Sequence, residues 1–263
     1  MEAFDIVYVK KIKDLVSKGK RDDGRSFTDF RSIKIEKEVI PNAEGSAEVF
    51  LGSTRVIAGI KLELETPMED TPEEGNMVVS ADLLPLASSS FELGPPNADA
   101  IELSRVVDRA IRSANVVDSS SLFIAEDKVW TIYIDINILD ADGNLFDASL
   151  LAAMAALQNT KIPKYENGKI IREERIHKLK LDNIVTSTTF AKINGELVLD
   201  PTSKEELASD ARITIATDGT QIRSMQKGMS GSFSLEEINK AIDISFSKHA
   251  ELEKALRNAG AHI

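Results

Sequence analysis

The chain has 263 residues, of which 42% are hydrophobic and 29% charged, and this balance predicts a globular protein with a substantial core. It contains no cysteine, which excludes disulfides, cysteine-ligated metal centres and a thiol nucleophile. The net charge of −11 requires any contact with nucleic acid to come from a local basic patch or from a partner. Residues 1–20 lack the apolar core of a secretory signal and no apolar run is long enough to span a membrane, so we expect a cytoplasmic protein without membrane contact.

The first half of the chain is predicted to contain a helix, a set of strands and two more helices. Residues 4–18 have the apolar spacing of an amphipathic helix. From residue 32 the apolar period changes to two and predicts a hairpin or meander, followed by an acidic loop over residues 65–75. Asp99 and Glu102 have the spacing of a helix cap. The remaining elements expected in this half are a helix over 100–115, a strand over 129–139 and a helix over 147–157.

The second half begins with a polar and charged segment, residues 161–182, which we interpret as containing a linker. Short strands and a final helix capped by Ser234 are expected after it, at 185–192, 196–199, 211–217, 221–225 and 235 onwards. Strands followed by a helix therefore recur, which predicts an α+β protein of two units and disfavours a Rossmann or TIM-barrel fold. The predicted organisation is an N-terminal helix and arm (1–30), a first unit (31–165), a linker (166–183) and a second unit (184–263).

The helix expected over residues 100–115 is the most informative element. At about 100° per residue, Arg105, Arg109 and Arg112 lie close together on the side opposite its apolar face. One interpretation is a solvated face on which Asp108 pairs with Arg105 and Arg112. The other is a ridge of guanidinium groups that grips phosphates. The spacing alone leaves both interpretations open.

Two acidic clusters are further candidates. The first lies at the end of the strand over 129–139 and consists of Asp135, Asp140, Asp142 and Asp147. Carboxylates are the ligand type that magnesium prefers. Turn formation and helix capping nevertheless account for most of this cluster. Residues 200–210 hold four carboxylates, of which a pair could do acid or metal chemistry. A loop with a solvated Glu205-Glu206 is the commoner explanation.

Five segments, in the same order along the chain, resemble the RNase PH family. They are Arg21 to Arg25 with Phe30-Arg31, then residues 45–63, 102–114, 140–157 and 197–216. The resemblance implies an RNase PH-like fold, with a core like domain 2 of ribosomal protein S5 and a C-terminal αβ unit. Within the family, the sequence looks most like an archaeal exosome ring subunit described as non-catalytic. The segments that carry this similarity are residues 56–63, 104–109 and 200–202.

That resemblance also implies partners and a reaction. Three heterodimers with a catalytic RNase PH-like subunit would form a hexameric ring, covered on one face by RNA-binding cap subunits. The ring would degrade single-stranded RNA from its 3′ end by phosphorolysis. Inorganic phosphate would be the co-substrate of the complex and magnesium a possible cofactor, while this chain would bind no cofactor itself.

Departures from the active members of the family indicate the role of this chain. Gly143-Asn144-Leu145-Phe146 stands where active members carry a phosphate-binding turn. Asp210 matches the second of two aspartates six residues apart, but Lys204 stands at the first position. The resemblance therefore implies a subunit without catalytic or metal-binding residues of its own. It implies RNA contacts by Arg105 and Arg109, with Arg112 less certain.

Two alternatives remain open at the level of sequence. The chain could be a self-sufficient phosphorolytic 3′-to-5′ exoribonuclease that uses Asp210 with Asp200 or Glu206. It could also be a plain scaffold on which Arg105, Arg109 and Arg112 are only solvated.

Overall fold

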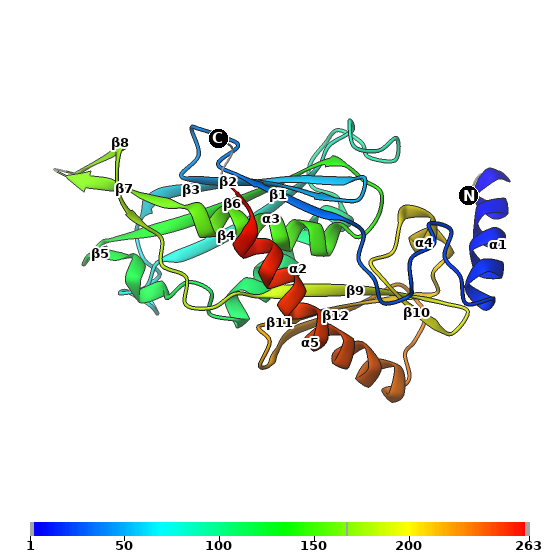
Figure 1. Cartoon of the computed structure of the whole chain (residues 1–263). Helices are drawn as coiled ribbons and strands as arrows, with labels where there is room; N and C mark the ends of the chain where they lie inside the picture. Colours follow the sequence, from blue (N-terminus) through cyan, green and yellow to red (C-terminus); the bar gives the residue numbers. More distant parts are fainter. Residues whose placement is uncertain (1–2, 167, 261–263) are drawn as a thin grey trace.

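The computed structural model describes residues 3–166 and 168–260 and contains two sheets and one additional hairpin (Figure 1). The first sheet has the order β1-β2-β3-β6-β4, with β5 paired to β6. Its strands are β1 (Ile33–Lys37), β2 (Gly45–Leu51), β3 (Thr54–Glu65), β4 (Asn76–Leu83), β5 (Phe123–Ala125) and β6 (Lys128–Asp140). The second sheet has the order β10-β9-β11-β12, with β9 (Thr186–Ile193), β10 (Glu196–Leu199), β11 (Ala211–Thr217) and β12 (Ile222–Gly228).

The predicted hairpin is present in the first sheet. Leu51 pairs with Thr54, so Gly52 and Ser53 form a two-residue connection between β2 and β3, and Gly52 has a φ of 59°. The alternating apolar residues of β3 and β6 are buried, as the period of two predicts. The sequence did not predict β4, which runs parallel to β6 at the edge of the sheet. Its burial pattern does not alternate strictly, which explains why periodicity did not reveal it.

Helix α3 (Leu145–Asn159) lies between the two sheets and forms the centre of the molecule (Figure 1). Every residue from Phe146 to Leu157 is buried, and many of them are alanines. Small side chains allow a close approach to the strands, and a Cβ on Gly45 of β2 would lie 2.5 Å from the carbonyl oxygen of Ala156. The helix is capped by Asn144 rather than by Asp147, which the sequence analysis had named as the cap.

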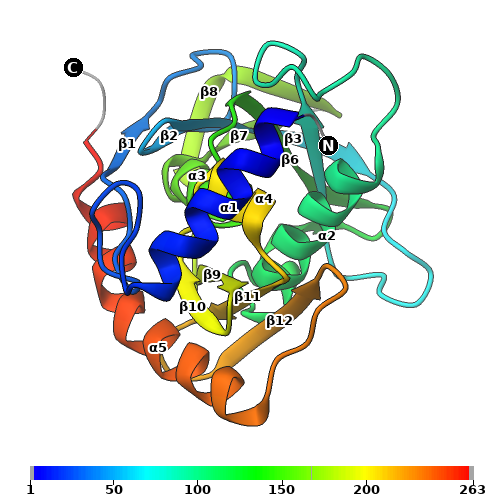
Figure 2. The ribbon, with the colours of Figure 1, turned by 90° about the vertical axis from the view of Figure 1, so that its right-hand side faces the viewer.

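Helices also cover the second sheet on both faces. Helix α5 (Leu235–Asn258) begins at the predicted cap, Ser234, which forms a capping box with Glu237. It packs against Ile213 and Ile215, whereas α1 (Ala3–Ser17) packs on the opposite face of the sheet. Figure 2 shows α1 lying beside the short helix α4 (Ser203–Ala208). The sequence analysis had favoured a loop with a solvated Glu-Glu pair there, but Thr202 and Glu205 form a capping box and Glu205 is buried.

The segment from residue 161 is mostly not a linker. Strands β7 (Lys161–Glu166) and β8 (Lys169–Lys178) form an antiparallel hairpin that extends beyond the first sheet in Figure 1. Arg172 of β8 donates to Glu44 at 2.7 Å and to Glu63 at 2.6 Å, which attaches the hairpin to that sheet. Charged residues on both strands hide the period of two, so composition alone suggested a connection. Most of the expected linker 166–183 is strand β8, whereas the domain limits of 1–30, 31–165 and 184–263 stay a prediction.

Within the described part of the chain, no helix is both long enough and apolar enough to cross a membrane.

Candidate functional site

Helix α2 (Ala98–Ser113) carries the predicted arginines and packs against β4 and β12. It begins at Ala98 because the Asn97 side chain accepts a hydrogen bond from the N–H of Ala100 at 2.9 Å, so the cap lies two residues before the predicted Asp99. The apolar residues of its predicted face, from Leu103 to Ile111, are buried, and all three arginines are exposed on the other side. The local sequence therefore dictates that the helix presents a basic face to solvent.

The three arginines are not equivalent. Arg105 has no hydrogen bond or ion pair with any residue that the structure describes. Arg109 donates to the neutral side-chain oxygen of Gln226 on β12 at 3.3 Å. Arg112 donates from Nε to Asp108 at 2.8 Å and also to the carbonyl oxygen of Met77. Arg105 and Arg109 thus keep uncompensated charges, whereas Arg112 serves the packing of α2 against the edge strand β4.

A pocket of about 290 Å³ lies beside the first turns of α2, between α3, α4 and β11. Arg212 of β11 stands in its wall, with the guanidinium carbon 4.2 Å from the centroid of the Phe146 ring. The same guanidinium donates to Glu102 of α2 at 2.8 Å. The basic group in this pocket is therefore stacked and paired through Nη2, while its buried Nε has no hydrogen-bond partner among the described residues.

Glu206 of α4 closes the pocket toward the start of α3. Its carboxyl oxygen accepts a hydrogen bond from the backbone N–H of Asn144 at 2.9 Å, at the positive end of the α3 dipole. Burial raises the pKa of Glu206 to about 7, although the N–H of Asn144, Arg212 and Arg31 favour the charged form. Where a phosphate would approach the beginning of this helix, the chain places a carboxyl group of its own.

The carboxylates considered for independent catalysis are engaged elsewhere. Asp210 forms an ion pair with Lys13 of α1 at 2.9 Å and is about half exposed. Asp200 is fully buried and accepts hydrogen bonds from Arg25, Arg31 and the side chain of Asn144. The contacts of Asp210 and Asp200 therefore leave no free pair of these carboxylates to face a common substrate.

The aspartates considered for magnesium also do not converge. Asp135 accepts from Ser80, Asp142 accepts from Ser203, and Asp147 is buried against Ser187 and Thr189. Among the described residues, no three histidine or carboxylate side chains lie where they could hold a metal ion. The aspartates named in the sequence analysis thus do not form one shared cluster, and magnesium as a cofactor of the complex stays a prediction.

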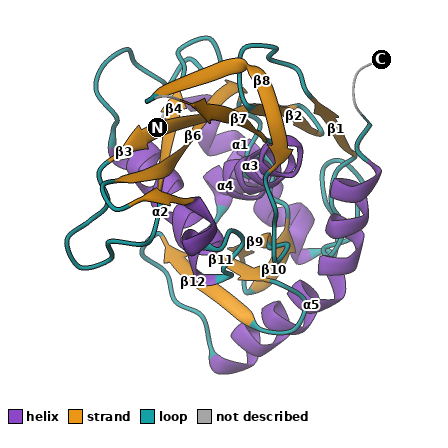
Figure 3. Cartoon of the chain, turned by 90° about the vertical axis from the view of Figure 1, so that its left-hand side faces the viewer, coloured by secondary structure: helices purple, strands orange, loops and turns teal. Residues whose placement is uncertain are grey.

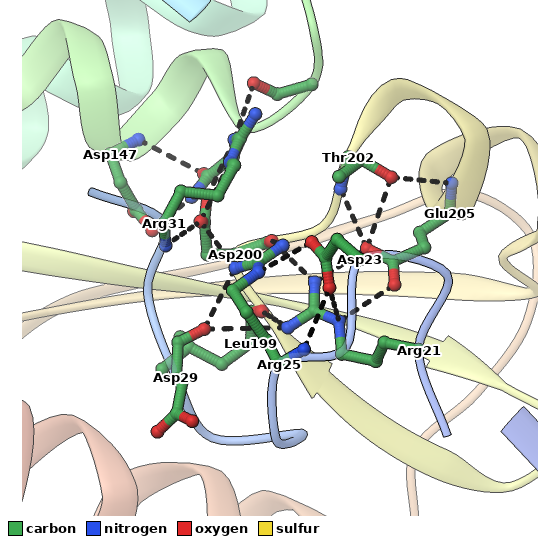
Figure 4. Close-up of polar contacts among 12 residues, drawn as sticks. Arg21, Asp23, Arg25, Asp29, Arg31, Asp147, Leu199, Asp200, Thr202 and Glu205 are labelled. Atoms are coloured by element: carbon green, nitrogen blue, oxygen red, sulfur yellow. Dashed lines mark hydrogen bonds and ion pairs between the residues drawn. The ribbon is translucent and has the colours of Figure 1, made fainter. Parts of the chain in front are cut away.

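A buried polar network joins the N-terminal arm to the two sheets, and the sequence analysis assigned it no role (Figure 4). Arg21 bonds Glu205 through two nitrogens, at 2.8 and 2.6 Å, and Arg31 bonds Asp200 at 2.9 and 2.8 Å. Asp147 accepts from Ser187, Thr189 and Asn144, yet burial outweighs these bonds and raises its pKa to about 6. The only signal in the sequence was the group of arginines around the Asp-Gly turn at residues 21–31.

The two sheets, the central helix α3 and the pocket beside α2, in which Glu206 lies at the start of α3, define an RNase PH-like protein. The models of the 3′ exoribonuclease family match residues 29–163 (domain 1) and 183–248 (domain 2), and the chain belongs to this family.

Two curated relatives carry the name exosome complex component Rrp42. The protein of Thermococcus gammatolerans is 48% identical over 255 residues, covering 95% of this chain and 93% of its own. That of Methanothermobacter thermautotrophicus is 45% identical over 248 residues and covers 92% of each chain.

Solved structures agree with this family. A chain of the Archaeoglobus fulgidus exosome with RNA bound to the active site has a TM-score of 0.90 and 37% identity, over 96% of this chain and 99% of its own. Rice Rrp46 has a TM-score of 0.70 at 17% identity over 90% of this chain and 99% of its own, which supports the fold alone.

Proposed function

We propose that this chain is the non-catalytic RNase PH-like ring subunit of an archaeal exosome. In this role it pairs with a catalytic subunit, helps to build the active site of that partner and positions single-stranded RNA for 3′-to-5′ phosphorolytic degradation. The names of the relatives and the archaeal exosome chain with the same fold support the assignment to such a complex. The observation that carries the proposal is the combination of exposed, uncompensated arginines on α2 with a pocket whose Arg212 and Glu206 already bond within the chain.

Arg105 and Arg109 are the proposed RNA contacts. A guanidinium group binds a phosphate through two parallel hydrogen bonds and remains charged at every physiological pH. Such contacts fix the position of the strand without reading its bases, as a subunit that presents substrate to a partner requires. Arg112 contributes less, because Asp108 and the carbonyl oxygen of Met77 already occupy its donors.

The pocket beside α2 supports a non-catalytic role, because Arg212 and Glu206 in its wall already bond within the chain. Glu206 already accepts the backbone N–H of Asn144 at the N-terminal end of α3, and its charged form repels an incoming phosphate. The alternative, a self-sufficient exoribonuclease based on Asp210, is less favoured because Lys13 neutralises that carboxylate on the surface.

The assembly that follows from the proposal has three heterodimers in a hexameric ring, with RNA-binding cap subunits over one face. Inorganic phosphate is the co-substrate, and it acts in the active site of the catalytic partner. A location in the cytoplasm, expected from the sequence, stays a prediction.

The decisive experiment is degradation of a single-stranded RNA with and without inorganic phosphate. It compares the purified chain, the catalytic partner and their mixture. Phosphate-dependent activity that requires the partner supports the proposal. Activity of this chain alone that disappears in Asp210→Ala would instead establish the self-sufficient enzyme.

A further inference from the structure

A groove of about 960 Å³ has no part in the proposed function. Its wall is formed by α5, the end of β1, the end of α3, the segment after β8 and the turn before β12. Figures 2 and 3 show α5 and α2 on opposite sides of the molecule. A ligand in the groove would therefore make contacts separate from those of Arg105 and Arg109.

The charges that line the groove are unevenly compensated. Each of its three carboxylates has a basic partner within about 2.7 Å: Asp182 with Lys180, Asp218 with Arg223, and Glu253 with Arg257. The Nζ of Lys37 donates only to neutral oxygens, those of the Gln158 side chain at 3.0 Å and the Leu256 carbonyl at 2.7 Å. The side chain of Lys178 has no ion pair or hydrogen bond with the residues that the structure describes. The groove thus contains two positive charges that no carboxylate of the described chain neutralises.

The fold holds these two lysines near each other at an energetic cost. Burial lowers the pKa of Lys37, and the positive charge of Lys178 lowers it further. An anion bound between the two ammonium groups would relieve both effects, because it supplies a counter-charge in place of the hydration that burial removes.

We propose that this groove binds a phosphate group between Lys37 and Lys178, either as inorganic phosphate or as a backbone phosphate of single-stranded RNA. Lys37 is the fixed donor, since its contact with Leu256 also holds the last turn of α5. Lys178 is exposed at the end of β8 and is the donor that closes on the ligand. The proposal does not depend on the role of the arginines on α2.

The test measures binding to the full chain with two probes. Calorimetric titration with inorganic phosphate tests the free anion, and fluorescence anisotropy with a labelled oligouridylate, in an Arg105→Glu and Arg109→Glu background, tests the RNA backbone. Lys178→Gln is expected to weaken binding about tenfold, because a charge-assisted contact is lost, whereas Lys178→Arg retains it. Lys254→Gln makes the same charge change on the exposed face of α5, outside the groove, and should bind like the wild type.

A second readout reports the site directly. Bound phosphate should protect Lys37 and Lys178 from acylation, measured by mass spectrometry, and should leave Lys254 unprotected. If Lys178→Gln weakens the binding of both inorganic phosphate and the oligouridylate, the groove is a general phosphate site. If it weakens the binding of the oligouridylate alone, the groove binds the RNA backbone. The proposal is overturned if neither probe binds, or if Lys178→Gln and Lys254→Gln lose affinity equally.

Discussion

Arg21 and Glu205 form a two-point ion pair with both side chains buried, at 2.8 Å from Nε to Oε1 and 2.6 Å from Nη2 to Oε2. Arg21 also donates to the carbonyl oxygens of Leu199 and Asp200, so the N-terminal arm, β10 and the start of α4 meet at one guanidinium group. The arm is therefore an integral part of the fold rather than an appendage.

Replacing Arg21 by alanine should lower the free energy of unfolding by about 3–5 kcal/mol, because Glu205 is left as a buried charge without a partner. Urea-induced unfolding measures the loss. The double variant Arg21→Met with Glu205→Leu should lose less, since it removes both charges. Arg257→Ala, at an exposed pair with Glu253, is the control and should change stability by less than about 1 kcal/mol. A loss in Arg21→Ala no larger than in the control would contradict this prediction.

Glu206 should make the protein less stable as the pH rises. Its pKa is about 7 in the folded state and near 4.5 in an unfolded chain, so folding favours the protonated form. The stabilisation is fully present below pH 4.5 and is lost as the pH rises through about 7. Between pH 5 and pH 8 the wild type should lose roughly 2–3 kcal/mol relative to Glu206→Gln, measured by urea unfolding at both values. Glu236→Gln, at an exposed carboxylate of α5, should follow the wild type. Parallel pH profiles for wild type and Glu206→Gln would refute the assigned environment.

Arg105→Ala and Arg109→Ala should each weaken RNA binding by the assembled complex about fivefold to tenfold, because each removes a contact to a phosphate. The slope of log affinity against log salt should fall by about 0.7 per lost contact to single-stranded RNA. Anisotropy titrations at several salt concentrations measure both quantities.

Arg112→Ala serves as the matched comparison on the same helix. Its donors are already used by Asp108 and the carbonyl of Met77, so the expected effect is lower stability with nearly unchanged RNA affinity. Equal losses of RNA affinity in all three variants would indicate that Arg105, Arg109 and Arg112 contribute equally to RNA binding. Unchanged affinity in all of them would favour the plain scaffold.

Gly45→Ala should destabilise the protein by about 1–3 kcal/mol, because the added methyl group would lie 2.3 Å from the Thr160 hydroxyl and 2.5 Å from the Ala156 carbonyl oxygen. Thermal unfolding measures the effect. Gly260→Ala is a suitable control, since a Cβ there meets no described atom within 4 Å. A variant as stable as the control would show that α3 can move away from β2.

The sequence predicted those elements whose own residues carry a clear signal. The alternation from Val56 to Leu64, the apolar face of α2 and the capping box at Ser234 all lead directly to structure. The β7–β8 hairpin was missed because charged residues obscure its period of two. The short helix α4 was missed because one and a half turns of helix show no periodicity.

The candidate site was harder to predict for a different reason. Exposure of Arg105 and Arg109 follows from helical spacing, and so does the pairing of Arg112 with Asp108. The contact of Arg112 with the carbonyl oxygen of Met77 depends on β4, a strand that periodicity did not reveal. The role of Glu206 depends on its contact with Asn144, 62 residues away, and no local pattern encodes a contact of that range. Local sequence therefore defines which groups are available, and tertiary packing determines which of them remain free.

The position of α3 has a consequence for how the chain can be divided. The family models separate two domains, yet the main core combines α3 and the first sheet with Ala216 of the second sheet and with Leu252 and Leu256 of α5. The first domain and the C-terminal helix therefore share one apolar core, although the second sheet also has two smaller clusters of its own. Because this core spans both domains, a cut between residues 179 and 185 should leave two fragments that stay together and unfold in a single transition.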